Sequence, residues 1–180
     1  MKLKTARQNF LRFTGQYLLH FALNVLCKSL KFSYTNKQVI EAFKLLAKYD
    51  IFPTINNMIG IPDETRETLF ETIELNREIV EILDHKHHMN IFTFIPFPGT
   101  QLRDVCIEKK YINAKDEIPF SYIRETMLDM PTISKEELYG LEKTMSLYIK
   151  LPKKYWADIK IAEQDNEIGK EMFEKLMKLI

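Results

Sequence analysis

The sequence predicts an α/β fold of two to three parallel strands with crossover helices, followed by an α-helical C-terminal tail. Two observations predict it. Residues 51–100 read as a strand, a Gly-Pro turn, a helix, a second strand and a Pro-Gly turn. Strands joined by a helix of this length are expected to be parallel neighbours, because parallel pairing needs a long crossover. From residue 134 onward, apolar residues recur at three- and four-residue steps, which is typical of amphipathic helices.

The first predicted element of this unit is a helix over residues 34–49. Thr35 and Gln38 have the spacing of a capping box, in which two side chains satisfy backbone amides at the helix start. Its buried stripe is expected to be Val39, Ile40, Phe43, Leu46 and Ala47. A strand over residues 51–59 follows, with two amide side chains, Asn56 and Asn57, near its end.

The crossover helix begins after the turn that ends this strand. Asp63 or Thr65 can cap it by accepting an orphan amide hydrogen bond, and Glu64 and Glu67 suit the positive helix start. Gly60 either permits a positive φ or lets a ligand approach the backbone. The stripe that packs on the sheet is expected to be Leu69, Phe70, Ile73, Val80 and Leu83.

The second strand is expected over residues 89–95, with a short helix over residues 100–109 after it. Pro62, Pro96 and Pro98 lack an amide donor, which suits residues at strand exits. In parallel α/β sheets and barrels, ligands bind at the carboxyl ends of the strands. The two turns at these ends are therefore the candidate binding site.

A histidine-rich link, residues 84–88, precedes the second strand. Three imidazoles so close together raise the hypothesis of a metal site. Their spacing does not place two of them one helical turn apart, and no nearby thiolate or carboxylate pair completes a ligand set. We therefore expect a solvated loop; the alternative is adventitious metal binding.

The two turns carry a family resemblance. Residues 58–65 (MIGIPDET) and 94–100 (FIPFPGT) resemble the last two strand ends of the barrel of the radical S-adenosylmethionine (SAM) superfamily. The resemblance implies a partial (β/α) barrel of that type over residues 34–112. It is closest to the subgroup that often carries a cobalamin (B12)-binding domain. Asp63 stands where Gly is usual in this pattern, which can change the conformation of the first turn.

The resemblance also implies a set of SAM-binding residues. It places Asn57 before the first turn, facing the barrel lumen and bonding the ribose or carboxylate of SAM; the alternative is that Asn56 and Asn57 pair with backbone at the edge of the core. It places the adenine edge against the main chain of residues 94–96; the alternative is a strand that simply ends at two prolines. The full implied set is Asn57, Met58, Gly60, Pro62, Phe94, Ile95 and Pro96.

The cysteines do not provide a cluster site. The family holds a [4Fe–4S] cluster with a C-x-x-x-C-x-x-C loop, whereas Cys27 and Cys106 are far apart and form no such loop. Each is expected to behave as a small buried apolar residue, and their usage favours a reducing cytoplasm. The chain is therefore expected to have lost the front half of the barrel or to be the back half of a larger product.

Two functions stay open. The chain is either the C-terminal fragment of a radical SAM enzyme that forms the rear of the SAM pocket, or a catalytically inactive remnant or helical interaction module. In the full family, a reduced cluster cleaves SAM to start radical chemistry such as methyl transfer or rearrangement. No catalytic residue is assigned, and this chain alone is expected to be inactive. Its partners would be SAM, an unknown substrate, and either a missing N-terminal half or a second copy at the open barrel edge.

Composition sets the remaining limits. A net charge of +1 argues against general nucleic-acid binding, which rests on a strong basic field. The apolar run 17–27 is too short to span a membrane, which takes about 20 apolar residues. We divide the chain into a basic N-terminal segment (1–33), the partial barrel (34–112) and a helical C-terminal extension (113–180). The extension resembles that of the cobalamin-associated subgroup, and its helices are expected to pack on the barrel or cover its mouth.

Overall fold

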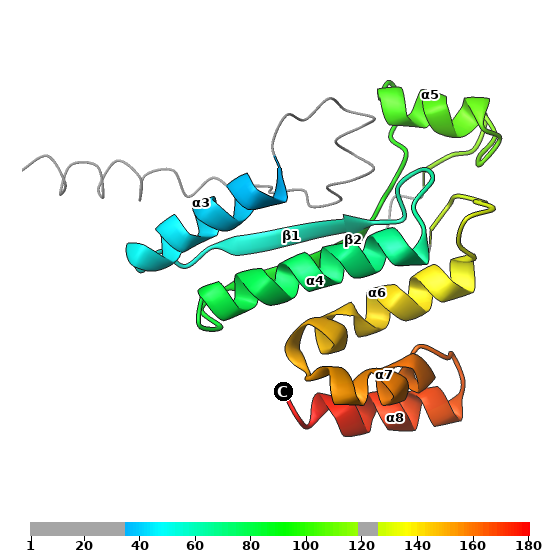
Figure 1. The fold of residues 1–180 in the computed structure, drawn as a ribbon. Coiled ribbons are helices and arrows are strands. Elements are labelled where there is room, and N and C mark those ends of the chain that lie inside the picture. The colour runs from blue at the N-terminus through cyan, green and yellow to red at the C-terminus, as the bar shows by residue number, and fades with distance from the viewer. Residues whose placement is uncertain (1–34, 119–125) are drawn as a thin grey trace, which may run out of the picture.

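A computed structural model describes residues 35–118 and 126–180. Two parallel strands are connected by one long helix, and the C-terminal helices lie on the same side of the sheet as that helix, whereas the helix directly after the second strand lies beyond the carboxyl ends of the strands (Figure 1). The predicted N-terminal segment, residues 1–33, lies outside the described residues. The elements are α3 (Asn36–Lys48), β1 (Thr54–Ile59), α4 (Arg66–Ile82), β2 (His88–Thr93), α5 (Gln101–Glu108), α6 (Lys135–Lys150), η1 (Lys153–Tyr155), α7 (Trp156–Ala162) and α8 (Glu167–Met177).

The parallel pair and its crossover helix are confirmed. β1 and β2 pair in parallel, in register from Thr54 opposite His88 to Ile59 opposite Thr93, and α4 connects them. Within residues 35–118 and 126–180 these strands form an open two-stranded sheet, not a barrel, and there is no third strand. Two six-residue strands are too few to close on themselves, because even small barrels use about eight strands.

Local capping signals fix the helix starts. The capping box of Thr35 and Gln38 is present as predicted. Thr65, rather than Asp63, caps α4, and it forms a capping box with Thr68. Because the hydrogen bonds of the first box join residues three positions apart, the sequence spacing alone was enough to predict it. The box of Thr65 with Thr68 was not predicted.

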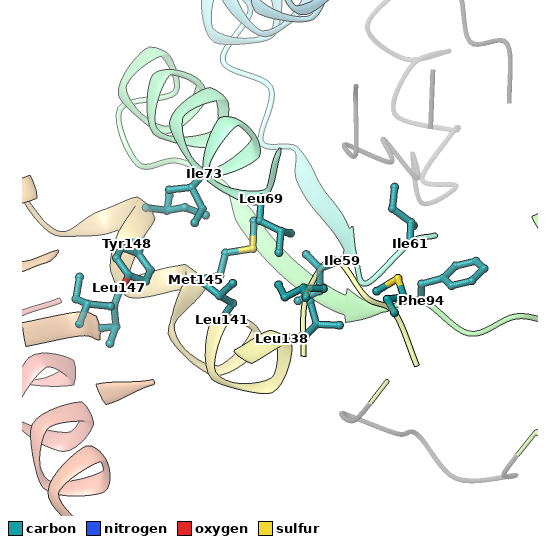
Figure 2. Close-up of a cluster of buried hydrophobic side chains, with 14 of the residues drawn as sticks. Ile59, Ile61, Leu69, Ile73, Phe94, Leu138, Leu141, Met145, Leu147 and Tyr148 are labelled. Atoms are coloured by element: carbon teal, nitrogen blue, oxygen red, sulfur yellow. The ribbon is translucent and has the colours of Figure 1, made fainter. Parts of the chain in front are cut away.

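Two apolar clusters hold the sheet to its helices. The larger one lies between the sheet, α4 and α6; Figure 2 shows Ile59, Leu69, Leu138 and Met145 meeting there. The smaller one joins α3, the start of β1 and the second half of α4 through Phe43, among others. Most of the predicted α4 stripe is buried, and Phe70 is half-buried. The buried members of the stripe are Leu69, Ile73, Val80 and Leu83.

The helical tail is confirmed as three α-helices and a short 3₁₀ turn. The predicted stripe of α6 is fully buried and consists of Leu138, Leu141, Thr144, Met145 and Tyr148. The stripe predicted for the last helix, from Ile168 to Ile180, is buried only in part: Leu176 is buried, Ile168 is exposed, and Ile180 is exposed beyond the end of α8. α8 contacts mainly α7, so the ends of its stripe reach beyond the surface that α7 covers. In the described ranges, no helix combines the length and apolar character that crossing a membrane requires.

A charged network fastens this tail to the start of α4. The Arg66 guanidinium donates to Glu163 at 2.6 and 3.0 Å and to Glu137 at 2.9 Å, and the Tyr148 hydroxyl donates to Glu163 at 2.6 Å. Burial raises the pKa of Glu163, but hydrogen bonds from Arg66, Tyr148 and Lys160 outweigh it, so the net shift is downward. The carboxylate is therefore held ionised inside the contact between the tail and the sheet layer.

Candidate functional site

The two strand exits lie side by side. Ile59 and Thr93 are register partners at the last positions of their strands, and the Phe94 amide donates to the Ile59 carbonyl at 2.7 Å. The turns over residues 60–65 and 94–100 therefore leave the same edge of the sheet. This is the edge at which ligands bind in parallel α/β proteins.

Gly60 opens the first turn, and two features require glycine there. Its φ is +77°, a left-handed value that glycine adopts without steric cost. A Cβ at this position would lie 2.6 Å from Cδ2 of Leu138 in α6. Of the two roles predicted for Gly60, the structure supports the positive φ. The space beside its Cα is taken by Leu138 and not left for a ligand.

Glu64 is a functional candidate that sequence reasoning placed wrongly. We expected it to face the positive helix start, but its side chain folds back into the turn and is 1% exposed. Its Oε2 accepts the Gly60 amide at 2.5 Å. Burial raises the pKa of Glu64 to about 8, even though hydrogen bonds from the Gly60 and Ile61 amides act in the opposite direction. The carboxyl group therefore uses the main-chain donors of the first exit.

Asp63 adopts a glycine-like conformation with φ +67°. Its carboxylate accepts from the Tyr111 hydroxyl at 2.7 Å and forms an ion pair with Lys109. Burial raises the pKa of Asp63, but the hydrogen bonds from Lys109 and Tyr111 lower it by more. The same hydrogen bond, with burial, raises the pKa of Tyr111 to about 12. An aspartate where the family pattern has glycine therefore keeps the turn and ties it to the segment after α5.

The second exit has few main-chain groups left for a ligand. The Phe94 amide is used by β1, the Ile95 carbonyl accepts the Phe97 amide at 3.0 Å, and the Pro96 carbonyl accepts from Arg103 at 2.9 Å. In the described part of the chain, the Phe94 carbonyl and the Ile95 amide form no hydrogen bond. Both belong to one trans peptide unit, so they point in opposite directions and a single ligand edge can use only one of them.

Arg103 in α5 holds this second exit, and sequence reasoning missed it. The residue is 7% exposed, and besides Pro96 its guanidinium donates to the carbonyls of Ala114 and Asp116 at 3.2 and 2.9 Å. Its position next to Leu102 on a short amphipathic helix was the only local signal. The three acceptors come from two separate loops, which the spacing of residues cannot reveal.

The strand amides differ from what we predicted. We predicted that Asn57 faces the barrel lumen, but its side chain faces α4. There it accepts a hydrogen bond from Asn76 at 2.8 Å and is 0% exposed. Asn56, on the opposite face, accepts from Asn90 at 2.8 Å. The alternative prediction, pairing with backbone, is also wrong, because both partners are side-chain amides. A ligand would reach Asn57 only by displacing Asn76.

The remaining predicted site residues gather near the exits. Met58 lies on the sheet face opposite α4, beside its register partner Phe92, and both are half-buried. Gly60, Phe94 and Ile95 follow directly at the carboxyl edge, and Pro62 and Pro96 are buried in the two turns. The structure thus brings the predicted set together except for the side chain of Asn57, which points to the other face.

The histidine link and Cys106 make packing contacts in the structure. Among residues 35–118 and 126–180, no three His, Cys, Asp or Glu side chains are grouped so that they could hold a metal ion. His88 begins β2, and its ring packs edge-to-face on Phe52 at 4.9 Å. Cys106 is fully buried, as predicted, and burial raises the pKa of its thiol to about 11. Cys27 lies outside the described residues.

Comparison with known proteins found no match: no protein-family model, no curated protein and no solved structure matches the chain. The family assignment therefore stays a prediction that rests on the two turn motifs.

Proposed function

We propose that this chain is the C-terminal part of a radical SAM enzyme and that residues 51–100 form the rear of its SAM pocket. The observation that carries the proposal is the adjacency of the two motif turns, joined by the hydrogen bond from the Phe94 amide to the Ile59 carbonyl. The two motif segments, whose starts are 36 positions apart in the sequence, thus share one edge, at the end of parallel strands where nucleotide-type ligands bind.

The residues of this chain do not fit the cluster of the family. A site-differentiated [4Fe–4S] cluster needs three thiolates in reach of one another, and the chain has two cysteines, of which Cys106 is buried in the core. The cluster would have to come from a different polypeptide segment, and no residue here is assigned to cobalamin. The contribution proposed for this chain is therefore to bind and orient the adenosyl part of SAM.

The binding contribution follows from the groups that the exits leave available. The peptide between Phe94 and Ile95 offers one hydrogen bond on either side, and Met58 provides an apolar surface on the sheet face opposite α4. The Gly60 amide is taken by Glu64. A nucleoside at this edge would gain little from charge and more from apolar contact.

The open edge of β1 supports a macromolecular partner. Pro53 and Ile59 direct their carbonyls to β2, so the alternate residues Thr54, Asn56 and Met58 direct their main-chain groups to the outer edge. Within the described residues, no strand pairs with these three residues on that outer edge. We propose that a strand from an N-terminal half, or from a second copy, pairs here, because an open strand edge is a template for pairing.

The second candidate function is an inactive remnant or helical interaction module. Two observations favour it: the lack of a cluster loop in this chain, and the internal use of the Gly60 amide by a buried carboxyl group. Both functions accept the same fold. They differ in whether the strand exits bind a nucleoside.

Isothermal titration calorimetry with SAM tests the proposal. The full chain is titrated alone and together with a coexpressed radical SAM N-terminal half that carries a C-x-x-x-C-x-x-C loop. We expect saturable binding to the pair, competition by 5′-deoxyadenosine, and no competition by methionine. Absence of SAM binding in both samples, with each protein folded by circular dichroism, would reject the enzyme proposal in favour of the remnant.

A further inference from the structure

Phe97 stands out at the second strand exit because its ring is exposed in an otherwise tied turn. The side chain lies between two prolines, Pro96 and Pro98, and Phe97 is 56% exposed. It belongs to neither apolar cluster, and it makes no aromatic contact within the part of the chain that the structure describes. Packing therefore gives no reason for a large aromatic residue at this position.

The exposure does not come from a loose backbone. The Phe97 amide donates to the Ile95 carbonyl at 3.0 Å, and the Phe97 carbonyl accepts from the amide and the hydroxyl of Thr100 at 3.2 and 2.7 Å. Arg103 holds the preceding carbonyl, that of Pro96. The position of the Cα–Cβ bond is thus fixed, and only two side-chain torsions stay free. A ring held in this way loses little conformational freedom when a ligand covers it.

We propose that Phe97 stacks on the planar base of a nucleoside bound across the two strand exits. This inference rests on the proposed function and names the side chain that would hold the base. The peptide after Phe94 can give one hydrogen bond to a ligand edge, which leaves most of the binding to contact with an apolar surface. An aromatic ring meets that need, because every base has a face on which such a ring can stack.

The experiment uses Phe97→Ala and a matched control, Phe52→Ala. Phe52 is 55% exposed, almost equal to Phe97, but it precedes β1 at the amino end of the strands. Affinity for SAM and for adenosine is measured by calorimetry with the same coexpressed N-terminal half. We expect Phe97→Ala to weaken binding of both ligands roughly ten-fold or more, as expected for the loss of one base–aromatic stack, and Phe52→Ala to leave it unchanged.

Phe97→Trp provides an independent readout. The ring face is retained, so binding should persist, and adenosine should quench the new indole fluorescence. The wild-type chain, whose only tryptophan is the half-buried Trp156, gives the reference signal.

The outcomes separate the two proposals. If wild-type protein binds SAM and Phe97→Ala binds it as tightly as Phe52→Ala does, the stacking role is rejected while the proposed function stands. If the wild type binds neither SAM nor adenosine, both are rejected. If Phe97→Ala changes only the sedimentation of the complex and not nucleoside affinity, Phe97 is a protein contact and the inference is overturned.

Discussion

The two ends of the sheet are built differently although both carry left-handed residues. At the amino end, Asp50 has φ +51°, and the exposed ion pair of Asp50 and Lys86 lies at 3.1 Å beside a cavity of about 410 Å³. At the carboxyl end, Gly60 and Asp63 have similar torsions but are tied by hydrogen bonds to side chains. Exposed ion pairs contribute little to the free energy of unfolding, whereas disrupting a buried hydrogen-bonded group lowers it substantially.

Unusual backbone torsions alone therefore do not mark a site in this molecule. The amino-end turns reverse the chain and use exposed side chains. The carboxyl-end turns are held by Glu64 and Arg103, two buried side chains whose partners include backbone atoms of the turns, the Gly60 amide and the Pro96 carbonyl. A site that must keep its shape before a ligand binds needs turns that are held by buried side chains, as at the carboxyl end.

The largest expected effect is a pH dependence of stability that comes from Glu64. Its pKa in the folded state is about 8, above the ordinary 4.5, so the folded chain binds the extra proton between these values. The contribution of Glu64 to the free energy of unfolding is therefore fully present below about pH 4.5 and is lost as pH rises towards 8, by on the order of 3–5 kcal/mol. Urea denaturation across this range should show the slope. Glu64→Gln should flatten it, and Glu171→Gln, on the exposed surface of α8, should not.

The next prediction compares the loss of stability on removing a buried ion pair with the loss on removing an exposed one. Glu163→Ala removes the carboxylate that Arg66 and Tyr148 contact near the start of α4, and we expect a loss of about 3 kcal/mol in the free energy of unfolding. Asp50→Ala removes the amino-end ion pair and should cost less than about 1 kcal/mol. Chemical denaturation measures both. Equal losses would show that the carboxyl end is no better supported than the amino end.

A pair of glycines separates torsion from packing. Gly60 and Gly99 have φ of +77° and +79°, but a Cβ would meet Leu138 only at Gly60. Gly99→Ala should lower the free energy of unfolding by about 1 kcal/mol, because alanine is sterically strained at a left-handed φ. Gly60→Ala should lower it by about 2 kcal/mol, because α6 must also shift. Thermal unfolding followed by circular dichroism gives the difference. If the two variants melt alike, Leu138 moves freely and does not define the first turn.

The smallest effect concerns the amide pair between the sheet and α4. Asn76→Ala leaves the buried Asn57 amide without its partner, for which we expect a loss of about 1.5 kcal/mol. Asn90→Ala removes the partner of Asn56 from an exposed position and should cost less. A larger loss for Asn90→Ala would mean that the face opposite α4 is the more tightly packed one.

Much of the fold could be predicted because its signals are local. The capping box at Thr35, the cap at Thr65 and the stripe of α4 depend on residues three or four positions apart. The barrel could not be obtained in this way, because closure depends on strands that pair over long distances. Strand bounds also shifted: β2 begins at His88 and ends at Thr93, since backbone pairing with β1, not the apolar run, limits it.

The candidate site was predicted only in outline. The strand exits were found from glycine and proline, whose backbone limits are readable in sequence. We predicted the wrong face for Asn57. Side chains alternate between the two faces of a strand, and the packing of Ile55 and Ile59 on the helices places Asn57, which lies between them, on the face towards α4. Glu64 and Arg103 were missed because their roles depend on carbonyls and amides that only the folded chain brings near.

Within the described residues, the outer edge of β1 pairs with no strand, and this bears on how the protein is expected to behave in solution. If that edge is completed by another molecule of the same chain, association and folding become linked, and the melting temperature should rise with protein concentration. If it is completed by a different polypeptide, the melting temperature should be independent of concentration until that polypeptide is added. Measuring the melting temperature by calorimetry at a series of protein concentrations therefore distinguishes these two kinds of partner, and the measurement requires no ligand.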